Sequence, residues 1–127
     1  MNEGRAETGG RAWAAGRRAE TWTAWWLRLK GYRIVARRFQ SPVGEIDLVA
    51  RKGRTLVFCE VKVRADADTA AESITHHQRR RIERAALAFL QRHPGLAGLD
   101  LRFDAIVFGR AGGPRPRHMA DAWRPDS

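Results

Sequence analysis

Two short acidic segments of the chain carry side chains that could bind a metal ion. Glu45 and Asp47 lie two residues apart in GEIDLVA, and Glu60 and Lys62 lie two residues apart in VFCEVKVR. Because side chains alternate between the faces of a strand, each pair would point to one side. Carboxylates, together with carbonyl and water oxygens, are ligands that Mg²⁺ accepts. A bound ion could activate water and stabilise the charge that builds on a phosphate.

The two segments are expected to form an antiparallel hairpin with strands over residues 45–50 and 55–64. Both runs are rich in β-forming residues, and Gly53 lies in the turn between them. In the second strand, Glu60 and Lys62 share a face with Leu56 and Phe58, while the opposite face is apolar throughout: Val57, Cys59, Val61 and Val63. This pattern is typical of a strand that runs from the core into a cleft.

The register of the hairpin decides which acids meet. One register places Asp47 near Glu60, whereas a two-residue loop at Lys52-Gly53 places Glu45 opposite Glu60 and Asp47 diagonal to it. Either register gathers carboxylates, so Lys62, an arginine or a divalent cation must offset their repulsion. The spacing alone is also compatible with a set of ion pairs on an exposed strand.

The other elements predict an α/β fold with a central mixed sheet of about four or five strands flanked by helices. Helices are expected over 13–30, ended by Gly31, and over 76–93, ended by Pro94 and Gly95. Strands are expected over 32–39 and 101–108, a strand or turn over 118–123, and loops over 65–75 and 111–117. One domain would cover residues 13–124, with tails at 1–12 and 125–127.

The first predicted helix has two apolar stripes, so we expect it to lie between two layers. One stripe contains Ala19, Trp22, Trp26 and Leu29, and the other contains Trp13, Glu20, Ala24 and Leu27. Trp22 and Trp26 are therefore expected in the core. Trp25 lies off these stripes and, if exposed, would suit a homodimer contact. Glu20 is notable because its neighbours on the stripe are apolar, although a surface Glu near a helix start fits equally well.

The charge of the chain favours a polyanionic partner. The formal net charge is +10 and the isoelectric point is about 11.4. Nucleic acid is the first candidate, with DNA favoured over RNA, and an anionic membrane surface is the second. Arginine, which binds phosphate in a rigid fork, supplies all but three of the 24 cations. The candidate phosphate contacts are Arg37, Arg38, Arg51, Arg54, Arg79, Arg80, Arg81 and Arg84.

Several classes of protein and site are excluded or disfavoured by the remaining residues. No apolar run approaches the roughly 18 residues of a membrane span. Cys59 is the only cysteine, which excludes an internal disulfide and suggests a core thiol in the reducing cytoplasm. Asp104 is expected to pair with an arginine rather than to take part in catalysis. The histidines His76, His77 and His118 are expected to be exposed to solvent.

The paired GEIDLVA and EVK segments, with further matches between about Gly16 and Trp123, resemble the YraN family of small bacterial proteins. That resemblance implies a restriction-endonuclease-like fold, similar to archaeal Holliday-junction resolvases. It implies that Asp47 and Glu60, with the Val61 carbonyl, bind Mg²⁺ or Mn²⁺. It also implies that Lys62 is the catalytic lysine and that Glu20 is an accessory carboxylate.

The chain departs from that family at four positions. Arg38 and Asp121 stand where the family often has Asn, Gln78 stands where Lys is frequent, and Trp123 stands where Phe is usual. None of these removes the acidic pair or the lysine. Three functions therefore stay open: a metal-dependent endonuclease acting on structured DNA, a catalytically silent nucleic-acid-binding module, and a peripheral membrane or protein adaptor.

Overall fold

Five strands form a mixed sheet in the order β1-β2-β3-β4-β5 in the computed structural model, which describes residues 18–64, 74–109 and 116–125. Strands β3 and β4 are parallel, and every other neighbouring pair is antiparallel. The predicted α/β class and mixed sheet are confirmed. The strands are β1 (Arg33–Ser41), β2 (Gly44–Lys52), β3 (Thr55–Arg64), β4 (Asp100–Gly109) and β5 (Arg117–Trp123). Both predicted tails largely lie outside the described residues, as do helix residues 13–17 and most of the loops over 65–75 and 111–117.

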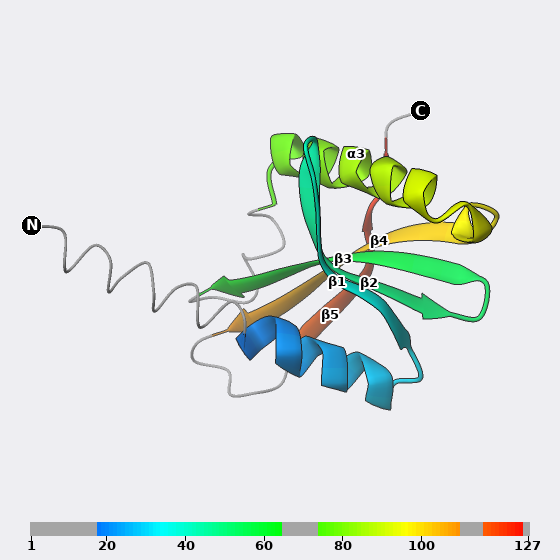
Figure 1. Ribbon diagram of the computed structural model, residues 1–127. Helices are drawn as coiled ribbons and strands as arrows, with labels where there is room; N and C mark the ends of the chain where they lie inside the picture. Colours follow the sequence, from blue (N-terminus) through cyan, green and yellow to red (C-terminus); the bar gives the residue numbers. More distant parts are fainter. Residues whose placement is uncertain (1–17, 65–73, 110–115, 126–127) are drawn as a thin grey trace, which may run out of the picture.

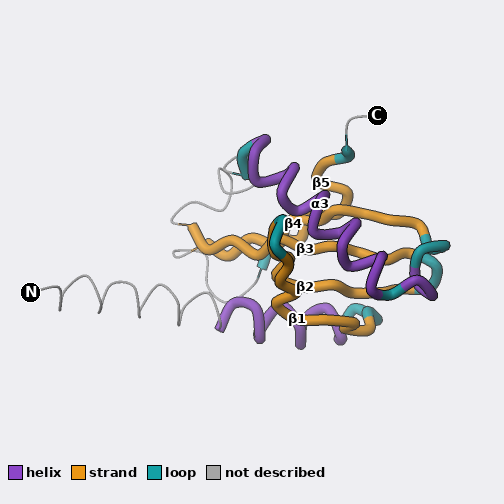
Figure 2. Tube along the Cα trace, turned by 45° about the horizontal axis from the view of Figure 1, so that its top comes forward, coloured by secondary structure: helices purple, strands orange, loops and turns teal. Residues whose placement is uncertain are grey.

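Two helices cover opposite faces of the sheet (Figure 1). The N-terminal helix covers residues 18–29 of the described chain, and α3 (His76–Arg92) connects the parallel strands β3 and β4. Thr75 caps α3 in a capping box with Gln78, and the short 3-10 helix η1 (Pro94–Leu96) follows its end. The tube in Figure 2 shows α3 lying across the strands. Within the described residues, no helix has the length and apolar character needed to cross a membrane.

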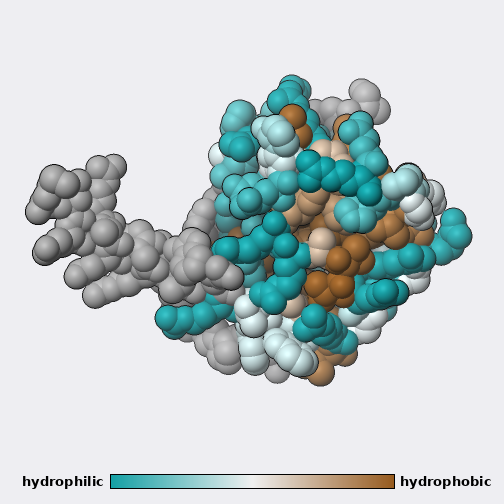
Figure 3. All heavy atoms as spheres, in the orientation of Figure 1, coloured by the Kyte–Doolittle hydropathy of each residue, from teal (hydrophilic) through white to brown (hydrophobic). Residues whose placement is uncertain are grey.

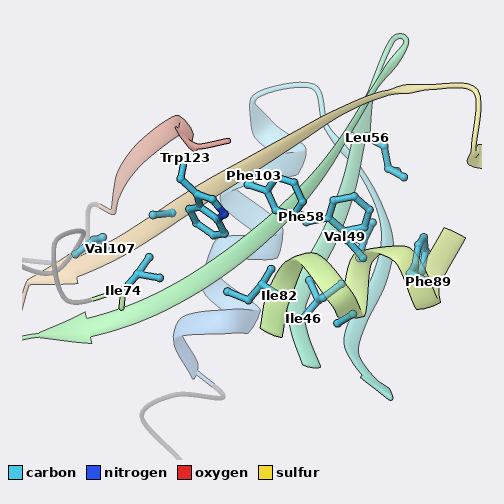
Figure 4. Packing of buried hydrophobic residues seen from close by; sticks show 13 residues of the cluster. Ile46, Val49, Leu56, Phe58, Ile74, Ile82, Phe89, Phe103, Val107 and Trp123 are labelled. Atoms are coloured by element: carbon cyan, nitrogen blue, oxygen red, sulfur yellow. The ribbon is translucent and has the colours of Figure 1, made fainter. Parts of the chain in front are cut away.

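Alternation along β3 divides the core into two clusters. Leu56 and Phe58 pack on the α3 side of the sheet, whereas Val57 and Cys59 pack on the side of the N-terminal helix. On the α3 side, Phe103 lies between the rings of Phe58 and Trp123, with ring centroids 5.5 and 5.4 Å away (Figure 4). The predicted core position of Cys59 is confirmed, because this free thiol is buried.

The N-terminal helix buries one predicted stripe and part of the other. Glu20, Ala24 and Leu27 of the one stripe are buried. Of the other stripe, Ala19 is buried and Trp26 packs partly buried against the core, whereas Trp22 is 47% exposed and Leu29 is 85% exposed. The predictions of a buried Trp22 and of a helix between two layers are wrong. The helix packs on the sheet with one side, and no second layer covers the other side among the described residues. Trp25 is 58% exposed, as expected.

The hairpin of β1 and β2 bends out of the sheet toward α3 (Figure 1). Ile46 packs in the core cluster on the α3 side, although Leu48, two residues further along β2, packs in the other cluster. At the tip, a Cβ on Gly44 would lie 2.5 Å from the backbone carbonyl oxygen of Arg81, so only glycine allows this close approach. The bend is therefore centred near Asp47, the residue between the two clusters.

Candidate active site

Asp47 and Glu60 lie level with each other on neighbouring strands, at the bend of β2. The pairing of β2 with β3 runs from Lys52 opposite Thr55 to Leu48 opposite Cys59, so Asp47 comes next, at the level of Glu60. The backbone N–H of Val61 donates a hydrogen bond of 2.8 Å to Oδ2 of Asp47. A backbone donor of β3 therefore holds the Asp47 side chain against the strand that carries Glu60.

The turn of this hairpin differs from one of the two predicted registers. Its two-residue loop is Gly53-Arg54 rather than Lys52-Gly53, because Lys52 pairs with Thr55. Gly53 has a φ of 60°, which suits the first central position of a type II′ turn, where glycine is preferred. The expectation of Glu45 opposite Glu60 is therefore wrong, and the alternative of Asp47 near Glu60 is confirmed.

Lys62 completes the group of side chains on the same face of β3. Its Nζ lies 3.1 Å from Oε1 of Glu60, and the side chains of Lys62 and Glu60 are only 13% and 16% exposed. An ion pair this far from water is screened less than one on the surface. The lysine therefore holds the Glu60 carboxylate in place and partly compensates its charge.

The Asp47 and Glu60 carboxylates repel each other when both are ionised. Burial, reinforced by the nearby charge of Glu60, raises the pKa of Asp47 from 3.8 to about 8. Burial also raises the pKa of Glu60, although the ion pair with Lys62 opposes this effect. Two like charges taken out of water disfavour each other's ionisation. A cation placed between them would relieve this cost.

Glu20 and Arg38 form a second ion pair near the acids, in which Glu20 is buried and the Arg38 side chain is 35% exposed. Glu20 comes from the N-terminal helix, and Nε of Arg38 on β1 donates to its Oε2 at 2.7 Å. The charge of Glu20 contributes to the raised pKa of Asp47, which places this carboxylate in its electrostatic neighbourhood. The Glu20 carboxylate is therefore already paired with Arg38, and its role as an accessory carboxylate of the site stays a prediction.

An open pocket of about 250 Å³ gives access to the acids. Glu45, Asp47 and Glu60 line it from the sheet, and Gln78, Arg81 and Ile82 line it from α3. The sequence predicts Arg81 only as one of a group of arginines on this helix, and its helical position beside Gln78 and Ile82 is the signal that separates it from the others. A cation on α3 thus faces the two carboxylates across the pocket.

The donor atoms fit a hard divalent cation with few protein ligands. Across the described ranges, no group of three or more His, Cys, Asp and Glu side chains is arranged to hold a metal ion. Mg²⁺ usually keeps several waters and takes one or two carboxylates, so Asp47 and Glu60 would suffice. The Val61 carbonyl would be a third oxygen, because the N–H and C=O of a strand residue point to the same neighbour, here β2. These are the three groups that the resemblance implies, and metal binding by them stays a prediction.

The predicted phosphate-binding arginines fall into three places. Arg37 and Arg38 lie on β1 near the N-terminal helix, where Arg37 donates to Oγ1 of Thr21 at 2.8 Å. Arg51 lies four residues along β2 from Asp47, or about 13 Å away, and Arg54 lies in the turn that follows β2. Arg79, Arg80 and Arg84 lie on α3, but Arg79 does not face outward as expected. Its guanidinium lies 5.7 Å from the centre of the Trp123 ring.

The expected partner of Asp104 is confirmed, whereas the expected exposure of His118 is wrong. Arg102 donates to both carboxylate oxygens of Asp104, at 2.9 and 2.8 Å. Pairing of β5 with β4 brings His118 beside the same acid, and its Nε2 lies 2.6 Å from Oδ2 of Asp104. The His118 side chain is consequently only 6% exposed. His76 and His77 are exposed, as expected.

Sequence comparisons place this chain among close relatives. The Uncharacterised protein family UPF0102 matches residues 19–108. A UPF0102 protein of Parvibaculum lavamentivorans is 54% identical over 125 residues, which cover 97% of this chain and 91% of the relative. A UPF0102 protein of Paramagnetospirillum magneticum is 52% identical over 115 residues, which cover 87% and 88% of the two chains. The predicted YraN resemblance is confirmed, and the chain belongs to the UPF0102 (YraN) family.

Proposed function

We propose that this protein is a Mg²⁺- or Mn²⁺-dependent phosphodiesterase that cleaves nucleic acid, with structured DNA as the favoured substrate. The observation that carries the proposal is the partly buried Asp47–Glu60 pair with Lys62 at 3.1 Å from Glu60. An acid that lines a pocket and whose pKa is raised by burial and by a like charge is a candidate for a functional site. The net charge of +10 suits a polyanionic substrate.

The side chains have separate roles in this proposal. Asp47 and Glu60, with the Val61 carbonyl, would hold the ion, which supplies activation of water and stabilisation of charge on the phosphate. Lys62 has three N–H donors, of which one serves Glu60, so another can hold the attacking water or a phosphoryl oxygen. Arg81 lies across the pocket, where its guanidinium can bind the substrate phosphate.

A catalytically silent nucleic-acid-binding module is the second candidate. The observation in its favour is that, among the described residues, the acids form a pair rather than a group of three metal-binding side chains. Such a module would bind nucleic acid with a steep loss of affinity between low and physiological salt. Its binding would not depend on a divalent metal ion.

A cleavage assay on branched and flapped DNA with Mg²⁺ or Mn²⁺ tests the enzymatic proposal. We expect Asp47→Asn and Lys62→Ala to lower the cleavage rate by about 100-fold or more, the usual effect of removing a group that acts on the reacting atoms. The matched control is Asp100→Asn, which changes an exposed acid on β4 and should leave the rate unchanged. Equal cleavage by all four proteins would indicate a contaminating nuclease and refute the assignment.

Calorimetric titration with Mn²⁺ separates the two candidates without a substrate. If the protein is a metal-dependent phosphodiesterase, titration with Mn²⁺ should give a saturable heat of binding with the wild type and with Asp100→Asn, but none with Asp47→Asn. The silent module predicts no saturable heat with any of these proteins, together with binding of DNA that is unchanged by EDTA.

A further inference from the structure

A second and larger pocket lies on the α3 side of the sheet. It has a volume of about 460 Å³ and lies between α3 and the ends of β4 and β5. Phe103 and Trp123, stacked at 5.4 Å, form its apolar floor. Leu87 and Leu101 line it while remaining 61% and 43% exposed. Large apolar side chains exposed around a hollow indicate a binding surface.

The same pocket is strongly positive. Arg79, Arg80, Arg84 and Arg124 line it, against the single acid Glu83. That acid accepts a hydrogen bond of 3.1 Å from Nε1 of Trp123, so it orients the indole. Nε of Arg79 is buried without a hydrogen-bond partner. The pocket therefore combines apolar walls with excess positive charge, which suits a ligand that has both an apolar face and an anionic group.

The outer surface of α3 joins this pocket to the candidate active site. Arg81 lines the pocket of the acidic pair, whereas Arg80 and Arg84 line the larger pocket. At 100° per residue, these three arginines lie on one exposed side of the helix, about 10 Å across. A strand of nucleic acid bound at Asp47 and Glu60 could cross α3 along these arginines with its phosphates in contact throughout. Figure 3 shows hydrophilic residues gathered at the top of the molecule, where α3 lies.

We infer that the larger pocket binds an unpaired nucleotide of a nucleic-acid strand that crosses α3, an inference that rests on the proposed function. The base would lie against Leu87 and Leu101, and Arg80 and Arg84 would hold the adjoining phosphates. A paired base cannot enter such a pocket, because its faces are covered by its neighbours in the stack. The pocket would thus favour single-stranded or flapped nucleic acid over a continuous duplex.

Fluorescence anisotropy in EDTA with a labelled single-stranded oligonucleotide tests this inference. We expect Leu87→Glu to weaken binding about tenfold, since it places a charge where the base packs. Leu29→Glu is the matched control, because Leu29 is an exposed leucine on the other helix and the substitution changes the net charge equally. The control should weaken binding less than about twofold, as expected for one added charge away from the site. With a blunt duplex, the two variants should behave alike.

Three outcomes would overturn the inference. The first is an equal effect of Leu87→Glu and Leu29→Glu on the single strand, and the second is an effect of Leu87→Glu on the duplex as large as that on the single strand. The third is a loss of binding to vesicles of anionic lipid by Leu87→Glu with unchanged oligonucleotide binding. Because the binding assay contains EDTA, its result does not depend on cleavage. Absence of cleavage would therefore refute the phosphodiesterase proposal alone, whereas the comparison of Leu87→Glu with Leu29→Glu decides the pocket.

Discussion

Each face of the sheet carries an acid that is at least partly buried, and the two acids are in opposite electrostatic settings. On the side of the N-terminal helix, Asp104 is fully buried and accepts hydrogen bonds from Arg102, from His118 and from the backbone N–H of Asp121. On the α3 side, Asp47 accepts one hydrogen bond from a backbone N–H and lies beside a second carboxylate.

The pKa values of the two acids move in opposite directions for this reason. Burial alone would raise the pKa of Asp104, but the hydrogen bonds from His118, Arg102 and Asp121 outweigh it and lower the pKa. Burial and the charge of Glu60 together raise the pKa of Asp47 to about 8. A fully paired buried acid stabilises the fold, whereas an acid held against a like charge destabilises it and is a candidate for binding a ligand.

The largest expected effect is the loss of the paired acid. Asp104→Asn leaves Arg102 without its counter-ion in a partly buried site, so we expect the free energy of unfolding to fall by about 3 kcal/mol or more. Urea denaturation at neutral pH measures this change. Asp100→Asn, on the same strand but exposed, should change stability by less than about 0.5 kcal/mol. Similar losses in the two variants would contradict the structural role of Asp104.

Loss of the Asp47 carboxylate is expected to have the opposite effect and to raise the free energy of unfolding. Asp47→Asn keeps an oxygen for the Val61 N–H but cannot ionise, so we expect it to stabilise the protein without metal at pH 8. The gain should be at least about 1.4 kcal/mol, the equivalent of one pKa unit. Thermal or urea denaturation in EDTA measures it. A destabilised Asp47→Asn variant at pH 8 would show that the acid supports the fold, as Asp104 does.

The pH dependence of stability sharpens the same comparison. Between pH 3.8 and about 8, Asp47 is protonated in the folded protein and ionised in the unfolded chain. Its contribution is therefore fully present below pH 3.8 and is lost as the pH rises toward 8. The contribution of Asp104 has the opposite sign: it is present above 3.8 and is lost as the pH falls through its lowered folded pKa. Asp47→Asn should abolish the loss of stability between pH 3.8 and about 8 and leave the loss below pH 3.8, which Asp104 contributes, unchanged.

The part of the site that depends on the alternation of side chains along a strand was predictable from the sequence. Strand periodicity and a glycine in the turn place Glu60 and Lys62 on one face and bring Asp47 to the neighbouring strand. The register of the β2–β3 hairpin was not predictable from the sequence. It depends on which residue of the turn adopts a positive φ, and here Gly53 does so at the first central position. The same strand rules predicted the core position of Cys59.

The remaining errors concern contacts between distant parts of the chain. Helical periodicity showed two apolar stripes on the N-terminal helix but could not show which one meets the sheet, so Trp22 was misplaced. His118 is buried because β5 pairs with β4 and brings it to Asp104, a contact that no local spacing encodes. The pocket position of Arg81 likewise depends on the bend of β2 toward α3. Neither the fold-family assignment nor the homodimer is tested by these contacts, and both remain predictions.

The smallest expected effect concerns the Glu20–Arg38 ion pair, where backbone strain at Arg38 and the ion pair act in opposite directions on stability. Arg38 and Asp121, with φ of 52° and 54°, are the non-glycine residues with positive φ in the described part of the chain. Asparagine, which the resemblance places at both positions, tolerates this conformation better than arginine. Relief of about 1 kcal/mol of strain in Arg38→Asn should be outweighed by loss of a charged hydrogen bond to Glu20, worth about 2 kcal/mol.

A double-mutant cycle separates these two contributions. We expect Arg38→Asn alone to cost about 1 kcal/mol, and the same substitution in a Glu20→Gln background to be neutral or stabilising by up to about 1 kcal/mol. Urea denaturation of the four proteins measures the coupling. Asp121→Asn is the control for the backbone, since the residue has the same φ but its side chain pairs only with the exposed Arg124 among the hydrogen bonds described. An equal loss from Arg38→Asn in both backgrounds would mean that the Glu20–Arg38 ion pair contributes no coupling energy, and would refute its stabilising role.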